Sequence, residues 1–325
     1  MCINSQGDVL VLELILGLVG LIAGLALLAY CGDKAVENSA IIALQLGIPS
    51  LMIGLLLVSL GTDLPEIINS IVASALNHGD INIGDSLGSV LAQITLVLGL
   101  LPLLAGTFKV QRNEVVIMGV CEVLALMLAV SIAEKGTISQ INGLFLVVSW
   151  PIFILLIRNS TIKKANKKEE QAPPPANKSR FHHFGIAVLG FTGVAIGSFI
   201  VIESVIMLSS VFHISEYIIS FFVVAIGTSL PELVVDLTAL RRKQYELAIG
   251  DIMGSCIIDA CFSIGIGPLI FPVEVTGNLV MVTGLYAIFV SATVIMTLTL
   301  REKVDRKTGV FFIFLYLLSY STLSL

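Results

Sequence analysis

The sequence predicts an all-α polytopic membrane protein in which ten transmembrane helices form two inverted five-helix repeats. Three observations predict this fold: the apolar composition, the recurrence of long apolar segments, and motifs that repeat at a fixed offset. Of the 325 residues, 56% are hydrophobic and 13% are charged, whereas about 25% of residues are charged in soluble domains. The mean hydropathy is +1.00. We therefore expect the chain to lie in a lipid bilayer and to have no nucleic-acid partner.

Ten apolar segments are long enough to cross the hydrocarbon core, which takes about 20 helical residues. They span residues 8–30, 36–76, 83–106, 114–133, 138–157, 184–210, 214–240, 246–271, 276–300 and 308–325. We expect the second, third, seventh and eighth helices to be broken. The first segment carries Asp8 and Glu13 and no preceding basic region, so it is expected to be a retained helix rather than a cleaved signal peptide.

The loops between the segments predict the orientation, because cytoplasmic loops are enriched in lysine and arginine. With an external N-terminus, 17 of the 18 basic residues fall on the cytoplasmic side and Lys135 alone falls outside. Both termini are then expected to be external. The five cysteines form no Cys-x-x-Cys pair and fall mostly inside or at the ends of apolar segments, which is typical of small buried thiols.

One long polar stretch divides the chain. It combines lysine-rich clusters with three consecutive prolines, Pro173 to Pro175, and shows no apolar periodicity, which is typical of a linker. The expected organisation is a first five-helix repeat over 1–157, a cytoplasmic linker over 158–183, and a second, inverted repeat over 184–325.

The two halves share motifs at an offset of 166 residues. Gly-Thr-Asp-Leu-Pro-Glu at 61–66 matches Gly-Thr-Ser-Leu-Pro-Glu at 227–232, and the Gly-Asp-x-x-Gly-Ser motif occurs at both 84–89 and 250–255. Because each repeat holds an odd number of crossings, the second half enters the membrane from the opposite side, and the motifs meet near the midplane. The first helix of each half also carries evenly matched glycines, at Gly17, Gly20 and Gly24 and at Gly190, Gly193 and Gly197.

The repeated motif places Glu66 and Glu232 deep in apolar segments. A charge at bilayer depth costs about 2.5–3.5 kcal/mol even on a mild insertion scale, so a compensating function is expected. The alternative is a pair of protonated carboxyl groups that are hydrogen-bonded between helices. Pro65 and Pro231 break their helices and leave backbone carbonyls free to bind a cation. Thr62 precedes Glu66 by one turn, so a hydroxyl and a carboxylate share one face.

Every candidate ligand near these motifs is an oxygen atom, which favours hard cations such as Ca²⁺ and Na⁺ over zinc or copper. The four histidines, His78, His182, His183 and His213, are expected in loops. An intramembrane aspartyl protease is excluded because its Gly-x-Gly-Asp signature is not present in either half, so we do not expect an enzyme. A cation channel remains a rival, but a channel does not require an internal inverted repeat.

The doubled motifs, over nearly the whole chain, resemble the cation/calcium exchanger superfamily and, more narrowly, the prokaryotic sodium/calcium exchangers. The resemblance implies a secondary-active antiporter of a prokaryotic plasma (inner) membrane that exchanges Ca²⁺ for Na⁺ by alternating access, without a cofactor or an obligate protein partner. It implies that the first and sixth helices slide together, although ordinary close packing explains their glycines equally well. It assigns ion binding to the carbonyl groups of Ser59 and Ala225 and to the side chains of Thr62, Glu66, Ser89, Gln93, Thr228, Ser229, Glu232, Ser255 and Asp259.

Three positions depart from the family pattern. Asp63 stands where Ser229 occupies the second repeat, Gln93 stands where asparagine or aspartate is common, and Asp236 stands where the first repeat has Ser70. Because like charges in a low-dielectric site favour protonation of one group, we expect Asp63 to join the ion site and to be protonated in part of the cycle. A Ca²⁺/H⁺ antiporter is therefore the alternative function. Otherwise Asp63 turns toward a cytoplasmic vestibule and stays ionised.

Other acidic residues in the apolar segments have weaker assignments. Asp85 and Asp251 follow glycines and are expected to cap helix N-termini, with ion binding as the alternative. Glu13, Glu122 and Glu203 lack ligand-like neighbours in the sequence and receive no role. The sequence leaves open the coupling ion, including K⁺, and the stoichiometry.

Overall fold

The structure is a computed structural model that describes residues 5–45, 59–161, 180–241, 243 and 245–324. Most of the expected linker, and part of the second apolar segment, lie outside these residues. Eight helices in the described part are long and apolar enough to cross a membrane. The second expected crossing is represented by shorter helices, and the tenth by a helix with a 3₁₀ extension.

The first half is helical apart from two short strands. Its elements are α1 (Ser5–Gln45), α3 (Ser59–Thr62), α4 (Leu64–Ala75), α5 (Gly79–Leu91), η2 (Ala92–Val97), α6 (Leu98–Leu104), β1 (Phe108–Lys109), α7 (Arg112–Ala133), β2 (Thr137–Ile138) and α8 (Gln140–Thr161). The second half repeats this order. Its elements are α9 (Arg180–Phe212), α10 (Glu216–Ile219), η4 (Ser220–Val224), α11 (Ala225–Thr228), α12 (Leu230–Arg241), α13 (Tyr245–Ile257), η5 (Ile258–Ser263), α14 (Ile264–Ile270), β3 (Val273–Glu274), α15 (Gly277–Arg301), β4 (Lys303–Val304), α16 (Arg306–Leu318) and η6 (Ser319–Ser324).

The internal repeat extends to the boundaries of the elements. The starts of α3, α4, α5, η2, α6, β2 and α8 each recur 166 residues later, at the starts of α11, α12, α13, η5, α14, β4 and α16. The expected all-helical fold of two repeats is therefore confirmed at the level of single helical turns.

The short strands show that the repeats are inverted. β1 pairs antiparallel with β4, and β2 pairs antiparallel with β3, with Phe108 opposite Val304 and Ile138 opposite Val273. Each pair joins a loop of one repeat to a loop of the other. The membrane-length helix α7 separates β1 from β2, so the two pairs lie at opposite ends of the bundle.

The expected helix breaks take two forms. A single residue, Asp63 or Ser229, interrupts the helices between α3 and α4 and between α11 and α12, and a proline follows two residues later. The third and eighth helices instead continue through π-helical turns, η2 and η5, which contain Gln93 and Asp259. Such turns are rare and occur frequently at functional sites, because they redirect the side chains that they carry.

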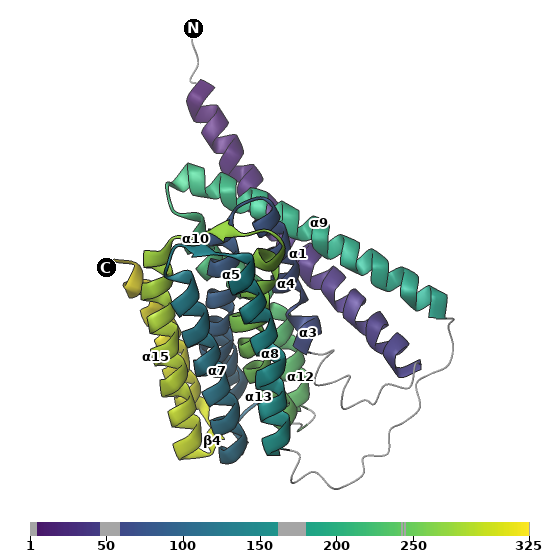
Figure 1. Cartoon of the computed structure of the whole chain (residues 1–325), viewed down its shortest axis with the longest axis vertical. Helices are drawn as coiled ribbons and strands as arrows, with labels where there is room; N and C mark the ends of the chain where they lie inside the picture. Colours follow the sequence, from purple (N-terminus) through teal and green to yellow (C-terminus); the bar gives the residue numbers. More distant parts are fainter. Residues whose placement is uncertain (1–4, 46–58, 162–179, 242, 244, 325) are drawn as a thin grey trace.

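The helices α1 and α9 lie along one another and extend beyond the remaining bundle (Figure 1). A Cβ atom at Gly24 would lie 3.1 Å from the carbonyl oxygen of Gly197, and one at Gly20 would lie 2.4 Å from the Ser204 hydroxyl. The matched glycines therefore allow α1 and α9 to pack closely on each other. They join the two helices into one unit.

Two expectations about loops are wrong. We expected a loop after the first segment, but α1 continues to Gln45, with Lys34 paired to Glu37 at 2.8 Å one turn away. An ion pair at this (i, i+3) spacing stabilises a helix, so the helix continues through these polar residues. His182 and His183 belong to α9 rather than to a loop.

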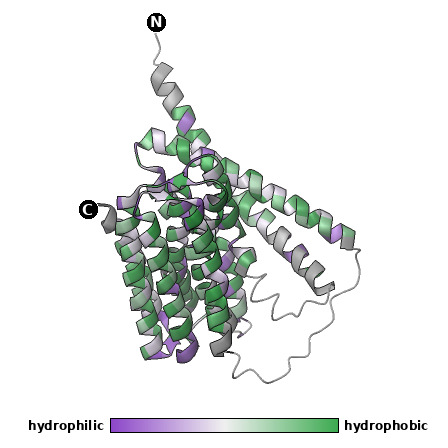
Figure 2. Ribbon diagram, viewed as in Figure 1, coloured by the Kyte–Doolittle hydropathy of each residue, from purple (hydrophilic) through white to green (hydrophobic). Residues whose placement is uncertain are grey.

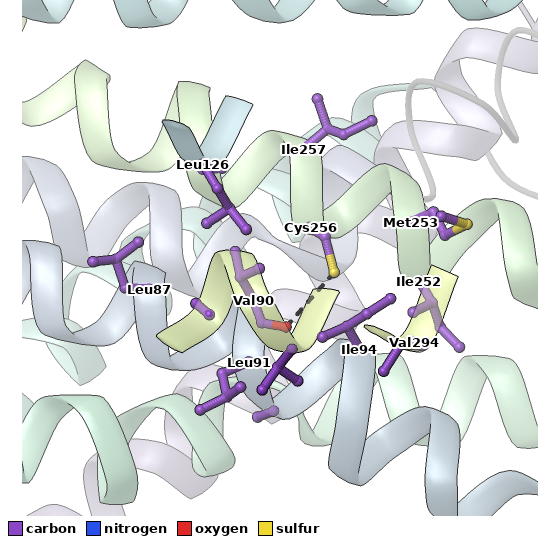
Figure 3. Close-up of a cluster of buried hydrophobic side chains, with 14 of the residues drawn as sticks. Leu87, Val90, Leu91, Ile94, Leu126, Ile252, Met253, Cys256, Ile257 and Val294 are labelled. Carbon is purple, nitrogen blue, oxygen red and sulfur yellow. Dashed lines mark hydrogen bonds between the residues drawn. The ribbon is translucent and has the colours of Figure 1, made fainter. Parts of the chain in front are cut away.

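The outer faces of the helices are largely hydrophobic, and hydrophilic residues gather toward the ends of the bundle (Figure 2). Leu189, Ile22 and Leu300 are each about 70% exposed, which suits contact with lipid. The interior is apolar around α5 and α13, where Leu91, Ile94 and Ile252 surround Cys256 (Figure 3). This packing fixes the third and eighth helices against each other.

Candidate functional site

The two motif glutamates occupy equivalent places at the helix breaks. Glu66 lies in the first turn of α4 and Glu232 in the first turn of α12. Their side chains are 1% and 0% exposed. Because the break starts a new helix just before each glutamate, the positive end of a helix dipole supports each carboxylate. The breaks therefore place two buried carboxyl groups in the interior of the protein.

The Ser89 hydroxyl of the same repeat connects Glu66 to Thr228 of the opposite repeat. The Ser89 hydroxyl on α5 lies 3.4 Å from Glu66 Oε1 and 3.4 Å from Thr228 Oγ1 on α11. Thr228 also donates toward the carbonyl groups of Val224 and Ala225, at 3.2 and 3.3 Å. The first repeat's glutamate and the second repeat's threonine thus share one polar layer.

The corresponding layer of the second repeat holds more acid. The side chains beside Glu232 are Thr62 and Asp63. Asp63 is fully buried, and no hydrogen-bond donor among the described residues reaches either of its oxygens. Its charge interacts with those of Asp259, Glu232 and Glu66. In this structure Asp63 is buried beside Glu232, which agrees with its expected place in the site and not with the alternative of a solvent-filled vestibule.

Gln93 and Asp259, which are equivalent positions of the two repeats, meet directly. Gln93 Nε2 donates to Asp259 Oδ2 at 3.1 Å, and the Ser263 hydroxyl donates to Asp259 Oδ1 at 3.1 Å. The Cys256 thiol lies 3.4 Å from Gln93 Oε1. Figure 3 shows the same thiol facing the Val90 carbonyl, at 3.8 Å. A thiol on one side and a carboxylate on the other therefore fix the orientation of the Gln93 amide.

The expectation that Asp85 and Asp251 cap helices is wrong. α5 begins at Gly79 and α13 at Tyr245, so both aspartates lie inside their helices. Asp85 instead accepts hydrogen bonds from Asn69 Nδ2 at 2.6 Å and from Thr228 Oγ1 at 3.2 Å. A Gly-Asp pair occurs both at helix starts and in helix interiors, so the pair alone does not show that the aspartate is a cap. The donors that bind Asp85 lie on other helices.

Three residues of this region did not stand out in the sequence. Asn69 holds Asp85 and accepts from the Ser198 hydroxyl of α9 at 3.2 Å, while Cys256 and Ser263 support Gln93 and Asp259. Asn69 lies three residues after Glu66, so its position on the same helical face was the available signal.

The remaining expected ligands also lie at or near the helix breaks. The hydroxyl groups of Ser229 and Ser255 are fully buried and have no hydrogen-bond partner in the described part of the chain. Ser59 opens α3 one turn before Asp63. No group of three or more histidine, cysteine, aspartate or glutamate side chains within the described ranges is arranged to hold one metal ion. A cation here would therefore need hydroxyl, amide and carbonyl oxygens beside its carboxylates.

Comparison with known proteins identifies the family. The model of the family described as sodium/calcium exchanger protein matches residues 16–158 and again 182–324. The chain is 33% identical over 268 residues to the inner membrane protein YrbG of Escherichia coli, covering 78% of this chain and 80% of that protein. It is 26% identical over 341 residues to the sodium/calcium exchanger MaX1 of Methanosarcina acetivorans, covering 94% of this chain and 95% of MaX1.

A solved structure agrees with this result. The sodium-calcium exchanger NCX_Mj, in crystals soaked with Na⁺ and Sr²⁺, superposes with a TM-score of 0.62 at 28% identity and covers 95% of this chain and 99% of its own. The likeness spans both repeats and the helices that carry the buried carboxylates. The chain therefore belongs to the sodium/calcium exchanger family and is an integral membrane cation transporter rather than an enzyme.

Proposed function

We propose that the protein exchanges Ca²⁺ for Na⁺ across the membrane by alternating access. One observation carries the proposal: Glu66 and Glu232 are equivalent, fully enclosed carboxyl groups, each at the start of a half-helix and each beside a hydroxyl group, that of Ser89 for Glu66 and that of Thr62 from the opposite repeat for Glu232. The names of MaX1 and NCX_Mj, which describe sodium/calcium exchangers, support the same choice of ions.

The proposed ligands are all oxygen donors. Ca²⁺ takes six to eight such ligands and favours carboxylates, so Glu66 and Glu232 are proposed to hold it from opposite sides and to balance its two positive charges. Na⁺ would use the hydroxyl and carbonyl oxygens around them. The proposed set is Ser59, Thr62, Asp63, Glu66, Ser89, Gln93, Ala225, Thr228, Ser229, Glu232, Ser255 and Asp259.

Exchange follows if the two ions compete for the same enclosed oxygens. Carboxylates left without a cation in a low-dielectric site are unfavourable, so the protein is expected to change its accessible side only when Ca²⁺ or Na⁺ fills the site. The paired helices α1 and α9, which their glycines lock together, are proposed to move as one body in that step. The repeats, 1–157 and 184–325, would exchange roles around the linker 158–183, with both termini external.

Asp63 supports a second candidate, exchange of Ca²⁺ for H⁺. Its oxygens have no donor in the described part of the structure, and its charge interacts with those of four other carboxyl groups, Asp259, Glu232, Glu66 and Asp251. A proton on Asp63 would relieve that repulsion. The second repeat has Ser229 at this position, so the acid is an addition to one side of the site only.

Proteoliposomes that contain the purified protein test the choice of counter-ion. Uptake of radioactive Ca²⁺ is measured with an outward Na⁺ gradient at equal pH, then with an outward H⁺ gradient without Na⁺, then with an outward K⁺ gradient. Sodium/calcium exchange predicts uptake under the first condition and none under the other two. Uptake driven by H⁺ alone would establish the second candidate, and uptake with no counter-ion would indicate a channel.

A further inference from the structure

The layer one helical turn beyond each motif glutamate differs between the repeats. In the first repeat this layer contains Ser70 and Asp85, and both are satisfied within the protein. Asp85 accepts from Asn69 Nδ2 at 2.6 Å and from Thr228 Oγ1 at 3.2 Å, and Ser70 Oγ accepts from the backbone N–H of Gly267 at 3.1 Å. The charge of this layer is a single carboxylate that already has its donors.

The equivalent layer of the second repeat contains two carboxylates. Asp236 replaces Ser70, and Asp251 corresponds to Asp85. Asp236 is fully buried, and neither of its oxygens receives a hydrogen bond from any donor in the described part of the chain. The carboxyl group of Asp251 lies beside it, and its charge interacts with those of Asp251 and Glu232.

This carboxylate pair lies between the central site and one end of the bundle. Asp236 follows Glu232 by four residues, about 6 Å along α12, in the direction of the exposed Arg241 at the end of that helix. Asp251 comes from the neighbouring helix α13, four residues before Ser255. The pair therefore faces Glu232 from the side of the α12–α13 connection.

We propose that Asp236 and Asp251 form an additional site for a hard metal cation, Ca²⁺ above all, through which the ion passes between Glu232 and the α12–α13 end. The proposal rests on the proposed function, because it takes Glu66 and Glu232 as the central site. Two buried carboxylates need positive charge nearby, and their four oxygens suit a Ca²⁺ ion that keeps part of its water shell. The first repeat has no such site, so the two ion pathways differ although the repeats are otherwise equivalent.

Equilibrium binding of radioactive Ca²⁺ to the purified full-length protein tests this proposal without any gradient. Glu66→Gln removes a ligand of the central site and leaves the charge of Glu232 in place. We expect this variant to retain weaker binding of Ca²⁺. Adding Asp236→Ser, which installs the first repeat's residue, should weaken the remaining binding at least about tenfold, as the loss of a charged ligand predicts. Asp251→Asn in the same background should have the same effect.

Glu122→Gln in the Glu66→Gln background is the matched control, because Glu122 is a fully buried carboxylate on α7 outside the pair. Its residual Ca²⁺ affinity should change less than about twofold, which separates ligand loss from general loss of buried charge. Equal weakening by Glu122→Gln, or unchanged binding with both Asp236→Ser and Asp251→Asn, would overturn the proposal. Complete loss of Ca²⁺ binding in the Glu66→Gln variant itself would also overturn it, because no binding would then remain for Asp236 and Asp251 to provide. If Asp236-dependent binding is found but the wild type does not exchange Ca²⁺ for Na⁺, the proposed function fails and the additional site stands.

Discussion

Replacing Gly88 by alanine should separate α5 from η4 and disturb the ion site. A Cβ atom at Gly88 would lie 2.2 Å from the carbonyl oxygen of Phe221 and 2.7 Å from the Cβ atom of Ala225. Neither partner can rotate away, because one is backbone and the other is the first side-chain carbon. The helices must therefore move apart by roughly 1 Å, at a cost of about 1–3 kcal/mol for overpacking. The better helix propensity of alanine offsets up to about 1 kcal/mol of this.

The displacement reaches the site through the next residue. Ser89 lies 3.4 Å from both Glu66 and Thr228, which is already near the outer limit of a hydrogen bond, so a shift of this size breaks both contacts. Each lost hydrogen bond is worth about 1 kcal/mol, or about fivefold in affinity. We expect the Ca²⁺ concentration for half-maximal uptake to rise at least about fivefold.

Two measurements check this prediction: thermal unfolding of the purified protein and Ca²⁺ uptake into proteoliposomes. Gly185→Ala is the control, since a Cβ atom placed there would have no packing neighbour within 4 Å; it should leave the Ca²⁺ dependence unchanged and should not lower the melting temperature. A Gly88→Ala protein with the melting temperature and Ca²⁺ dependence of the wild type would refute the reasoning.

Three further predictions concern single side chains. Asp63→Ser should abolish any response of Ca²⁺ uptake to a pH gradient while Na⁺-driven uptake persists; an unaltered response would exclude Asp63 as the protonated group. Cys256→Ala should raise the Ca²⁺ requirement for uptake several-fold, whereas Cys256→Ser and Cys261→Ala stay within about twofold; equal effects of all three would contradict its support of the amide. The backbone N–H of Thr308 and nearby basic groups lower the pKa of Asp305. The ionised side chain therefore stabilises the fold at pH values above the ordinary pKa of a carboxyl group, and this contribution is lost as the pH falls through the lowered pKa. The difference in melting temperature between wild type and Asp305→Asn should therefore vanish well below pH about 4, and a constant difference would disprove it.

The repeated motifs predicted the fold well because one offset fixes the register of both halves. The 166-residue spacing of the Gly-Thr-x-Leu-Pro-Glu segments recurs at the starts of most other elements. The prolines predicted the breaks next to Asp63 and Ser229 correctly, since a proline has no N–H and clashes with the carbonyl group four residues earlier. These features depend on local chemistry and therefore show in the sequence.

Features that depend on contacts between distant helices could not be predicted. Asp85 was expected to be a cap because it follows a glycine. The sequence could not reveal its actual role, because its partners, Asn69 and Thr228, come from other helices. The π-helical turn around Gln93 has no proline or glycine signal of its own, and its side chain is placed by the meeting with Asp259 across the two repeats. The sequence showed that Asp236 replaces Ser70, but only the structure shows that Ser70 has a backbone donor whereas no described donor reaches Asp236.

The central claim is that Glu66 and Glu232 together hold the transported Ca²⁺. Na⁺-driven Ca²⁺ uptake at equal pH on both sides, compared among wild type, Glu66→Gln, Glu232→Gln and Glu122→Gln, tests it most directly. We predict uptake by the wild type and by Glu122→Gln, and none by either variant of the motif glutamates. Full Na⁺-driven uptake by Glu66→Gln or Glu232→Gln would contradict the account.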